Sequence, residues 1–403
     1  MVAFDPAAVR GQFPFFARHP ACVYLDNAAT THRLGSAIDR MVEFYYDENS
    51  NVHRGVYDLS ERATLAYEFA RETVANYLHA RRAEEIIFTG GTTDALNTVA
   101  AGLDGEICVG DEILITAMEH HSNILPWKAL VDRRGAKLKI VELTPTGELD
   151  MEDFFKKLST RTKIVAVAHV SNVLGTINPI KYITKLAGTV GALTVIDGAQ
   201  WITSGSIDVQ DLDCDFYAFS AHKTFGPMGV GVLYGRMEIL EKLAPFRLGG
   251  GMVQKVTAED VIHRAPPDRF EGGTPNVAGI VALPCAIEFL KSVDWTKYRD
   301  HERKIRSTIE KGAEEIPGLR LLGTASDKVG IYALAHPTVH AHDLASMLAC
   351  QNICVRAGNH CAQLLLPHFQ ISQSLRASFT LYNTVDEAAT LIEALSGCIR
   401  RMS

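Results

Sequence analysis

Short apolar segments alternate along this chain with longer segments in which apolar residues recur every three or four positions. The apolar segments run into glycine, serine, threonine, histidine or aspartate, which is typical of buried strands that end in loops. The clearest are Glu85–Phe88, Ile113–Thr116, Lys163–Val170, Leu193–Ile196, Asp215–Phe219 and Val230–Tyr234. Their alternation with helices predicts an α/β fold with a mostly parallel sheet and right-handed crossovers.

Helical periodicity is clear over Leu59–Leu78, and a helix is also expected over Asp150–Leu158. The pattern changes after about residue 287, where a charged helix precedes short strands and a further helix. These elements are expected at Thr296–Glu315, Leu319–Leu322, Val329–Ala335 and His342–Ala349. We therefore predict a large domain over 21–286 and a smaller α+β domain over 287–403, with segment 1–20 packing on the smaller domain.

Composition narrows the class of protein. The chain has 403 residues, 47% of them hydrophobic, which suffices for two domains. A net charge of -7 gives no reason to expect a nucleic acid partner. The start of the chain lacks a signal peptide, and its apolar runs are too short for a bilayer, so we expect a cytoplasmic protein without a membrane partner. Eight scattered cysteines without a Cys-x-x-Cys pair predict reduced thiols and no metal site.

Lys223 follows one of the predicted buried strands, in the stretch Ser220–Lys223, and precedes a glycine-rich turn. A lysine in such a place has a lowered pKa, and its neutral amine can condense with a carbonyl group. Alone the signal is weak, because most lysines are simply solvated.

Three other strand ends carry polar groups. Thr92 and Thr93 follow two glycines at the start of a helix, where backbone N–H groups and hydroxyls suit a phosphate, although an ordinary helix cap fits equally well. His120 follows a strand and suits stacking or proton transfer, although a structural histidine is the commoner case. Asp197 closes an apolar strand and needs either a cationic partner or a cluster of backbone N–H groups.

The four strand ends together indicate one ligand. In open α/β sheets, ligands bind beyond the carboxyl ends of the strands. A phosphate cradle, a flat base, a carboxylate and a lysine at that edge match pyridoxal 5'-phosphate, which is held by a lysine Schiff base and an acidic partner of its ring nitrogen.

Longer motifs extend over nearly the whole chain. They are Asn51–Arg54, Gly91–Thr93, Met118–Asn123, Asp197–Gln200, Ser220–Lys223, Arg269–Asn276, Arg356–Gln363, Leu375–Ser378 and Tyr382–Thr384. In kind and order they resemble those of the class V aminotransferase family, and more narrowly the cysteine desulfurases of the SufS/CsdA type, whose relatives include selenocysteine lyase. The resemblance implies the fold type I of pyridoxal-phosphate enzymes.

It also implies roles for the matching residues. Lys223 is expected to form the Schiff base and to move protons at the substrate Cα, Asp197 to pair with the ring nitrogen, and His120 to stack on the ring. Other groups are expected to contact the cofactor: its phosphate by Thr93, Ser220 and His222 with Thr92 in the same loop, its ring oxygen by Gln200, and the phosphate of the neighbouring subunit of a homodimer by Thr274.

The substrate side of the predicted site lies near the end of the chain. Asn172 and Arg376 are expected to bind the substrate carboxylate, Arg376 through a bidentate pair. Arg356 is a further candidate substrate contact, and with His360 it is expected to favour the thiolate of Cys361.

Cys361 decides the predicted reaction. By resemblance, its thiolate attacks the sulfur of L-cysteine and keeps it as a persulfide while L-alanine forms, and the sulfur then passes to an acceptor protein for iron–sulfur cluster assembly. A buried structural cysteine would be the commoner case, but the surrounding motif favours a nucleophile. A selenocysteine lyase acting on L-selenocysteine, another class V reaction and a partner protein that has lost catalysis remain as alternatives.

The chain departs from the family pattern in two places. Gln363–Pro367 has proline later than relatives, which commonly place it directly after the Cys-Ala-x triplet. Leu248–Val253 is one residue shorter than in some relatives. Neither departure touches an expected catalytic position.

Overall fold

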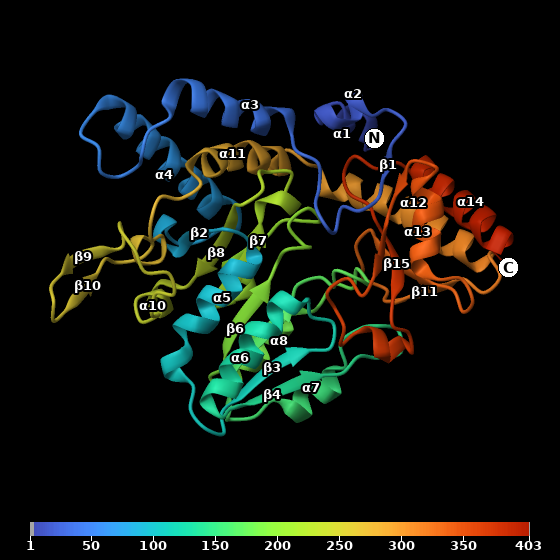
Figure 1. Cartoon of the computed structure of the whole chain (residues 1–403). Coiled ribbons are helices and arrows are strands. Elements are labelled where there is room, and N and C mark those ends of the chain that lie inside the picture. Colours follow the sequence, from blue (N-terminus) through green and yellow to red (C-terminus); the bar gives the residue numbers. More distant parts are fainter. Residues whose placement is uncertain (1–3, 403) are drawn as a thin grey trace.

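A seven-stranded sheet forms the centre of the molecule, and the computed structural model, which describes residues 4–402, is shown in Figure 1. In spatial order the strands are β2 (Ile86–Thr89), β8 (Gly231–Gly235), β7 (Phe216–Ser220), β6 (Leu193–Asp197), β5 (Thr162–Ala168), β3 (Glu112–Thr116) and β4 (Lys137–Val141). Only β8 runs antiparallel to its neighbours. The predicted mostly parallel sheet is confirmed.

The two faces of this sheet pack into two different apolar clusters. Along β7, Phe216 and Ala218 belong to the cluster with α5 (Thr92–Gly102) and α6 (Leu125–Arg134). Tyr217 and Phe219 belong instead to the cluster with α4 (Asp58–Leu78) and α11 (Val277–Lys291). Such alternation follows from the two-residue period of a strand. Both faces are covered, which explains why β3, β6 and β7 are buried along nearly their whole length.

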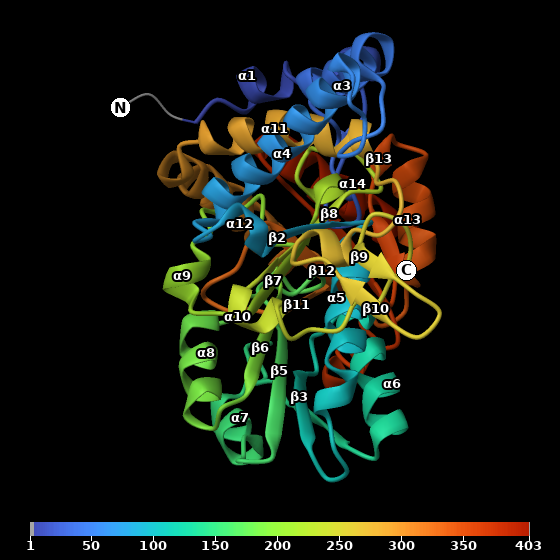
Figure 2. The same ribbon diagram turned by 90° about the vertical axis from the view of Figure 1, so that its left-hand side faces the viewer.

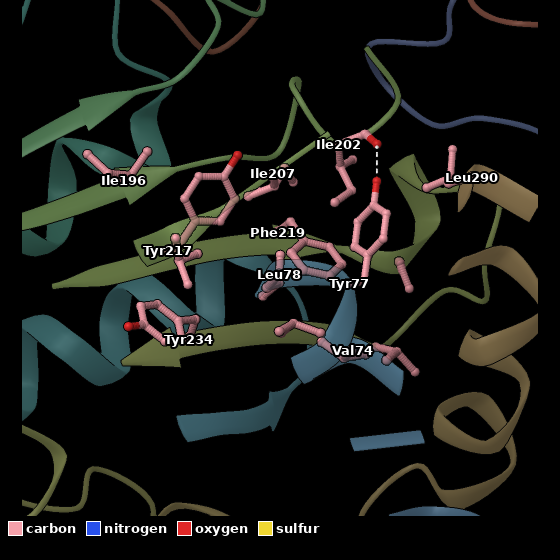
Figure 3. Packing of buried hydrophobic residues seen from close by; sticks show 14 of the residues in the cluster. Val74, Tyr77, Leu78, Ile196, Ile202, Ile207, Tyr217, Phe219, Tyr234 and Leu290 are labelled. Atoms are coloured by element: carbon pink, nitrogen blue, oxygen red, sulfur yellow. Dashed lines mark hydrogen bonds between the residues drawn. The ribbon is translucent and has the colours of Figure 1, made fainter. Parts of the chain in front are cut away.

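Figure 3 shows the face on which α4 (Asp58–Leu78) packs. Tyr77 and Leu78 of this helix lie against Phe219 of β7, and the Tyr77 hydroxyl donates a hydrogen bond to the Ile202 carbonyl oxygen at 3.4 Å. The loop after β6 is therefore tied to the core behind the sheet.

A second sheet lies toward the C-terminal end of the chain. It has four antiparallel strands in the order β11 (Arg320–Leu322), β12 (Ile331–Ala335), β15 (Ser374–Ser378) and β14 (Arg356–Gly358). Around it lie α12 (Trp295–Glu314), α13 (Ala341–Ala349) and α14 (Val385–Met402). The predicted boundary between 286 and 287 lies within α11 (Val277–Lys291), and the division into two domains stays a prediction.

The remaining elements are short. They are α1 (Pro6–Arg10), α2 (Pro14–Arg18), α3 (Gly35–Glu43), a π-helix (Phe44–Glu48), α7 (Met151–Lys157), α8 (Ile180–Thr189), α9 (Val209–Leu212), α10 (Met237–Leu240), the β9–β10 hairpin (Val253–Val256, Val261–His263) and the parallel pair β1–β13 (Val23–Tyr24, Ile353–Cys354). Between residues 4 and 402, no helix combines the length and apolarity needed to cross a membrane.

The N-terminal segment touches both parts of the chain. Phe13 packs edge-on against Phe225 and Tyr382, with ring centroids 5.2 and 4.8 Å apart, and Arg10 forms an ion pair with Glu387 at 2.8 Å. Residues 1–3 of the predicted segment 1–20, and residue 403 of the predicted small domain, lie outside the described residues.

A buried ion pair anchors the Gly272–Thr274 loop behind β2. Arg71 of α4 bonds both carboxylate oxygens of Glu271, at 2.7 and 2.8 Å, and the Arg71 side chain is only 1% exposed. Glu271 also accepts hydrogen bonds from the Tyr67 hydroxyl and the Phe88 N–H, both at 2.7 Å. The carboxylate is therefore fully used, and the loop cannot move without breaking this network.

Arg71→Met should destabilise the fold by about 3–5 kcal/mol, because it leaves the Glu271 carboxylate buried without its cation. Arg62→Met removes an exposed helix pair with Asp58 and should change the free energy of unfolding by less than about 1 kcal/mol. Urea unfolding of both variants measures the difference. Equal effects of the two substitutions would show that the buried pair is not the anchor.

Candidate active site

One cavity gathers the predicted strand ends. It has a volume of about 190 Å³ and lies where β2, β3, β6 and β7 end. Of the predicted site residues it is lined by Thr92, Thr93, His120, Asn172, Asp197, Gln200, Ser220, His222, Lys223, Arg356, Cys361 and Arg376. Thr274 is the one predicted contact that lies elsewhere.

The start of α5 and the end of β7 form a polar cradle. The Thr92 N–H donates to the Ser220 Oγ at 2.8 Å, and the Thr92 hydroxyl lies at the same distance from it. Gly91 has φ +153°, and a Cβ on Gly231 of β8 would lie 2.4 Å from the Gly91 Cα. Glycine at 231 is thus required for strand and loop to meet. Hydroxyls and N–H groups at a helix N-terminus form a site suited to a phosphate.

Two histidines border the cavity in their neutral forms. Burial and the nearby Lys223 amine lower the pKa of His120 and of His222 to about 4. His120 Nδ1 accepts the Ser122 N–H at 3.1 Å, so its proton resides on Nε2. A neutral, partly buried imidazole offers a flat face without adding charge.

Asp197 and Lys223 close the deepest part of the cavity. Burial raises the pKa of Asp197, whose carboxylate accepts the Ala199 N–H at 3.0 Å. Burial lowers the pKa of Lys223 to about 8, against the opposing effect of the Asp197 charge. A substantial fraction of the Lys223 amine is therefore neutral near pH 7–8, as nucleophilic attack requires.

Gln200 lies beside these groups and is oriented by the N-terminal loop. Its amide Nε2 donates to the Ala28 carbonyl oxygen at 2.8 Å. Tyr24–Thr31, an apolar run that ends in small polar residues, thus provides one wall of the cavity.

Arg376 on β15 is buried with a fixed orientation. It donates to the Asn172 carbonyl oxygen at 2.9 Å and to Asp26 at 3.0 Å, while its Nε is buried without a partner. The Oδ1 atom of Asn172 is also buried without a partner, and its amide donates only to the His360 carbonyl oxygen, at 2.8 Å. Unsatisfied buried donors and acceptors of this kind indicate a polar ligand at the site.

The Cys361 thiol is exposed at the mouth of the cavity. It lies on a loop with φ 126°, 52° and 55° at Gly358, His360 and Cys361. The Cys361 N–H donates to Asn359 Oδ1 at 3.0 Å, and its carbonyl oxygen accepts the His121 N–H at 2.7 Å. Left-handed backbone at non-glycine residues is strained, so this loop is held in place by its surroundings.

The two groups expected to favour a thiolate differ in charge. Burial lowers the pKa of His360 to about 3, so this imidazole is neutral at pH 7. Arg356 has a guanidinium, which is positively charged in proteins, and this side chain is about half exposed, 3.4 Å from Asp26. Of the two, only Arg356 offers a positive charge at the cavity mouth.

Thr274 lines a second cavity, of about 200 Å³, together with Asn51, His53, Arg54 and Gly250. This cavity shares no residue with the first. The motifs Asn51–Arg54 and Arg269–Asn276 thus come together around this cavity, away from the cavity that contains Lys223.

Sequence reasoning missed Asp26 and the role of Ser122. Asp26 forms ion pairs with both arginines of the cavity, with Arg356 through Oδ2 and with Arg376 through Oδ1. Asp26 ends a short apolar run, but its two arginine partners lie more than 300 positions later in the sequence. Ser122 links His120 to Thr93, with oxygen–nitrogen and oxygen–oxygen distances of 2.9 and 2.7 Å, and nothing in the sequence spacing indicated that link.

These residues fit pyridoxal 5'-phosphate. The hydroxyl-rich start of α5 suits its phosphate, Asp197 its ring nitrogen, and the partly neutral Lys223 amine its aldehyde. The unpartnered atoms of Asn172 and Arg376 remain for a bound amino acid.

Known proteins are similar to this chain in sequence and in fold. The family model described as aminotransferase class-V matches residues 23–391. A cysteine desulfurase of Synechococcus elongatus is 41% identical over 100% of this chain, although the chain spans only 64% of that protein. A probable cysteine desulfurase of Halalkalibacterium halodurans is 44% identical, with 93% of this chain and 92% of that protein covered.

Two solved structures agree over the full length. The cysteine desulfurase CsdA of Escherichia coli has a TM-score of 0.92 at 35% identity, with 100% of both chains covered. A cysteine desulfurase of Thermococcus onnurineus has a TM-score of 0.94 at 36% identity, with 100% of this chain and 99% of that chain covered. The predicted fold class and the resemblance are confirmed, and the chain belongs to the aminotransferase class-V family, within its cysteine desulfurases.

Proposed function

We propose that this chain is a pyridoxal-phosphate-dependent cysteine desulfurase that converts L-cysteine to L-alanine and supplies sulfur for iron–sulfur clusters. The observation that carries the proposal is the exposed Cys361 thiol at the mouth of the cavity that also contains Lys223. Transamination or epimerisation needs no thiol there. Transfer of the substrate sulfur to the enzyme as a persulfide does.

The cofactor is held by residues of four strand ends. Thr92, Thr93, Ser220 and His222 would hold its phosphate, Asp197 its ring nitrogen and Gln200 its ring oxygen, while His120 would lie against the ring; all of them line the cavity. When bound, pyridoxal phosphate supplies an aldehyde that condenses with amines and a ring that withdraws electrons from the substrate Cα.

Lys223 would hold the cofactor through its aldehyde, and its amine would take the Cα proton of a bound substrate. Its lowered pKa leaves a substantial fraction of the amine neutral near pH 7–8, as a base requires. Arg376 would orient the substrate by its carboxylate, using the Nε donor that the chain leaves without a partner. The free atom of Asn172 is Oδ1, an acceptor, which would take a hydrogen bond from a donor such as the substrate amine.

Cys361 then receives the sulfur. Its thiolate attacks the substrate sulfur, an S–S bond forms as the Cβ–S bond breaks, and the electron pair stays with Cβ, which gains a proton as L-alanine forms. The persulfide on Cys361 remains at the surface, accessible to a sulfur-acceptor protein. Arg356 contributes positive charge beside the attacking thiolate and the substrate.

The proposed enzyme is a homodimer in which Thr274 contacts the phosphate of the other subunit's cofactor. The second cavity supports this, because it contains Thr274 but no cofactor-binding group of its own chain. Large apolar side chains are exposed on the elements nearby, at Tyr46, Val56, Phe69, Leu248 and Val256. They lie on or beside α3, α4 and the β9–β10 hairpin, which face the viewer's side in Figure 2, and exposed patches of this kind favour an interface.

Lys223 should take up the cofactor fastest above about pH 8, because only the neutral amine attacks the aldehyde. Mixing cofactor-free protein with pyridoxal phosphate between pH 6 and pH 10 and following absorbance measures the rate. We expect about a tenfold rise per pH unit below the pKa and a plateau above it. Lys223→Ala is the control and should show no covalent uptake. A rate that still rises steeply at pH 10 would mean an ordinary lysine.

Cys361→Ala should lower sulfur release and L-alanine formation from L-cysteine by at least about 100-fold, because the acceptor of the sulfur is lost. Cys350→Ala, at another exposed cysteine, should retain activity. Alanine and sulfide are quantified for both variants, with L-selenocysteine tested in parallel. Full activity of the Cys361 variant on L-cysteine would reject the persulfide mechanism and favour the selenocysteine lyase or another class V reaction.

Arg376→Lys should raise KM for L-cysteine by about tenfold or more, because an ammonium group cannot make the planar paired contacts of a guanidinium. The exposed Arg401→Lys is the matched control and should leave KM unchanged. Steady-state kinetics of alanine formation separates KM from kcat. An unchanged KM would remove Arg376 from the substrate contacts.

A further inference from the structure

A third cavity, also polar, lies between the two parts of the chain, separate from the Lys223 and Thr274 cavities. Its volume is about 280 Å³. Ile177 lies in the loop after β5 and Trp201 in the loop after β6. Arg299 and Arg303 come from α12, and Lys328 precedes β12. None of its residues lines the active-site cavity, and the proposed mechanism uses none of them.

Lys328 is a buried cation without a counter-ion. It is 6% exposed, its Nζ donates to the Gly323 carbonyl oxygen at 3.0 Å, and it lies 4.9 Å from the centre of the Tyr332 ring. No carboxylate of residues 4–402 forms an ion pair with it. Burial and the charge of Arg306 lower the pKa of Lys328 to about 7. Buried ammonium groups are normally paired, and Lys328 lacks a direct anionic partner, although Glu302 and Asp327 line the cavity and the Glu310 charge partly offsets the effect of burial on the Lys328 pKa.

Tyr332 adds an unused donor to the same cavity. The residue is 1% exposed, and its hydroxyl has no hydrogen-bond partner among residues 4–402. A buried hydroxyl without a partner is unfavourable by roughly 1–3 kcal/mol. Both Tyr332 and Lys328 line the cavity, where one acceptor group could satisfy both.

The arginines around the cavity retain free donors. Arg299 is paired with Glu302 at 2.8 Å through one nitrogen and lies 5.4 Å from the Trp201 ring. Arg303 is paired with Asp300 through one nitrogen. A guanidinium carries five N–H groups, so each of these side chains has several left over. Glu302 is a carboxylate of the lining, but burial raises its pKa and it already accepts from Arg299 and the Gly330 N–H.

We propose that this cavity binds a small oxyanion, either a phosphate or a short polycarboxylate. Lys328 supplies the counter-charge, the Tyr332 hydroxyl donates one hydrogen bond, and Arg299 and Arg303 donate others. The cavity lies just below the range of about 300–1,000 Å³ that is typical of drug-sized ligands, which favours a small anion over a nucleotide.

Binding at this place connects the two parts of the chain. The Val329 N–H donates to the Gly175 carbonyl oxygen at 2.9 Å, and the Ile177 N–H donates to the Asp327 carbonyl oxygen at 3.2 Å. Trp201 stacks on His169 with ring centroids 4.4 Å apart. An anion that contacts Lys328 and α12 thus adds a further link between the two parts of the chain. Because it binds the folded state, it stabilises that state increasingly as its concentration exceeds its Kd.

The test is calorimetric titration of the pyridoxal-phosphate-loaded protein with inorganic phosphate and, separately, with citrate at constant ionic strength set by chloride. The loaded protein is used so that the cofactor's own phosphate fills the cradle at α5. Thermal unfolding at increasing concentration of each anion gives a second reading. We expect binding of at least one anion and a Tm that rises with its concentration; phosphate identifies a phosphoryl ligand, and citrate a polycarboxylate.

Two variants locate the binding. Lys328→Met should weaken it by about tenfold or more, and Tyr332→Phe by about threefold, since each removes one contact to the anion. Tyr332→Phe removes only a hydroxyl that has no partner, so its fold is expected to be intact. Lys297→Met, at an exposed lysine of α12 outside the cavity, is the control and should leave binding unchanged.

The proposal fails if neither anion binds at 10 mM or if the Tyr332 and Lys328 variants bind as well as the unchanged protein. It also fails if Lys297→Met weakens binding as much as they do, because the effect would then be one of general charge. None of these measurements depends on desulfurase activity, so a failure of the anion site can be distinguished from a failure of the proposed function.

Discussion

The active site depends on one constraint: the Asp197 carboxyl group and the Lys223 amine are both buried away from water, at the ends of two adjacent strands. Burial raises the pKa of Asp197 at the end of β6 and lowers that of Lys223 just after β7, and each charge counteracts the effect of burial on the other. Such an arrangement needs strands that bring the groups side by side and deep. The parallel pairing of β6 with β7, between two apolar clusters, provides this.

The site combines this rigid part with a part that lies on a loop. Lys223 and Asp197 are fixed by the sheet, and Arg376 is fixed by β15 and Asp26. Cys361 instead lies on an exposed loop that two backbone hydrogen bonds and the buried His360 hold. Proton transfer at Cα requires a fixed base, whereas delivery of sulfur to another protein requires an exposed atom. The two requirements are met by different secondary structure.

Much of the sheet and of the site could be predicted from the sequence. An apolar run that ends in a polar residue marks a strand end locally, and the ends of parallel strands lie at one edge of the sheet. The predicted Asp215–Phe219 strand is observed as Phe216–Ser220, one residue later, and the strand ends meet in one cavity as expected. The β9–β10 hairpin was not predicted, because its side chains are mostly exposed and show no apolar alternation. Asp26 was missed as a site residue, because its importance comes from two arginines more than 300 positions later, a contact that no local pattern reveals.

Lys223 and Lys328 show how little a shifted pKa says without its surroundings. Burial lowers the pKa of both amines, to about 8 and about 7. Lys223 is placed at a strand end with a carboxylate, a phosphate cradle and a thiol, so its neutral form has a reaction to perform. Lys328 lies among arginines, the carboxylates of Glu302 and Asp327 and an unpartnered tyrosine hydroxyl. Desolvation therefore provides a neutral nucleophile in one cavity, whereas in the other it leaves an ammonium group that a bound anion would stabilise, and the neighbouring groups make the distinction.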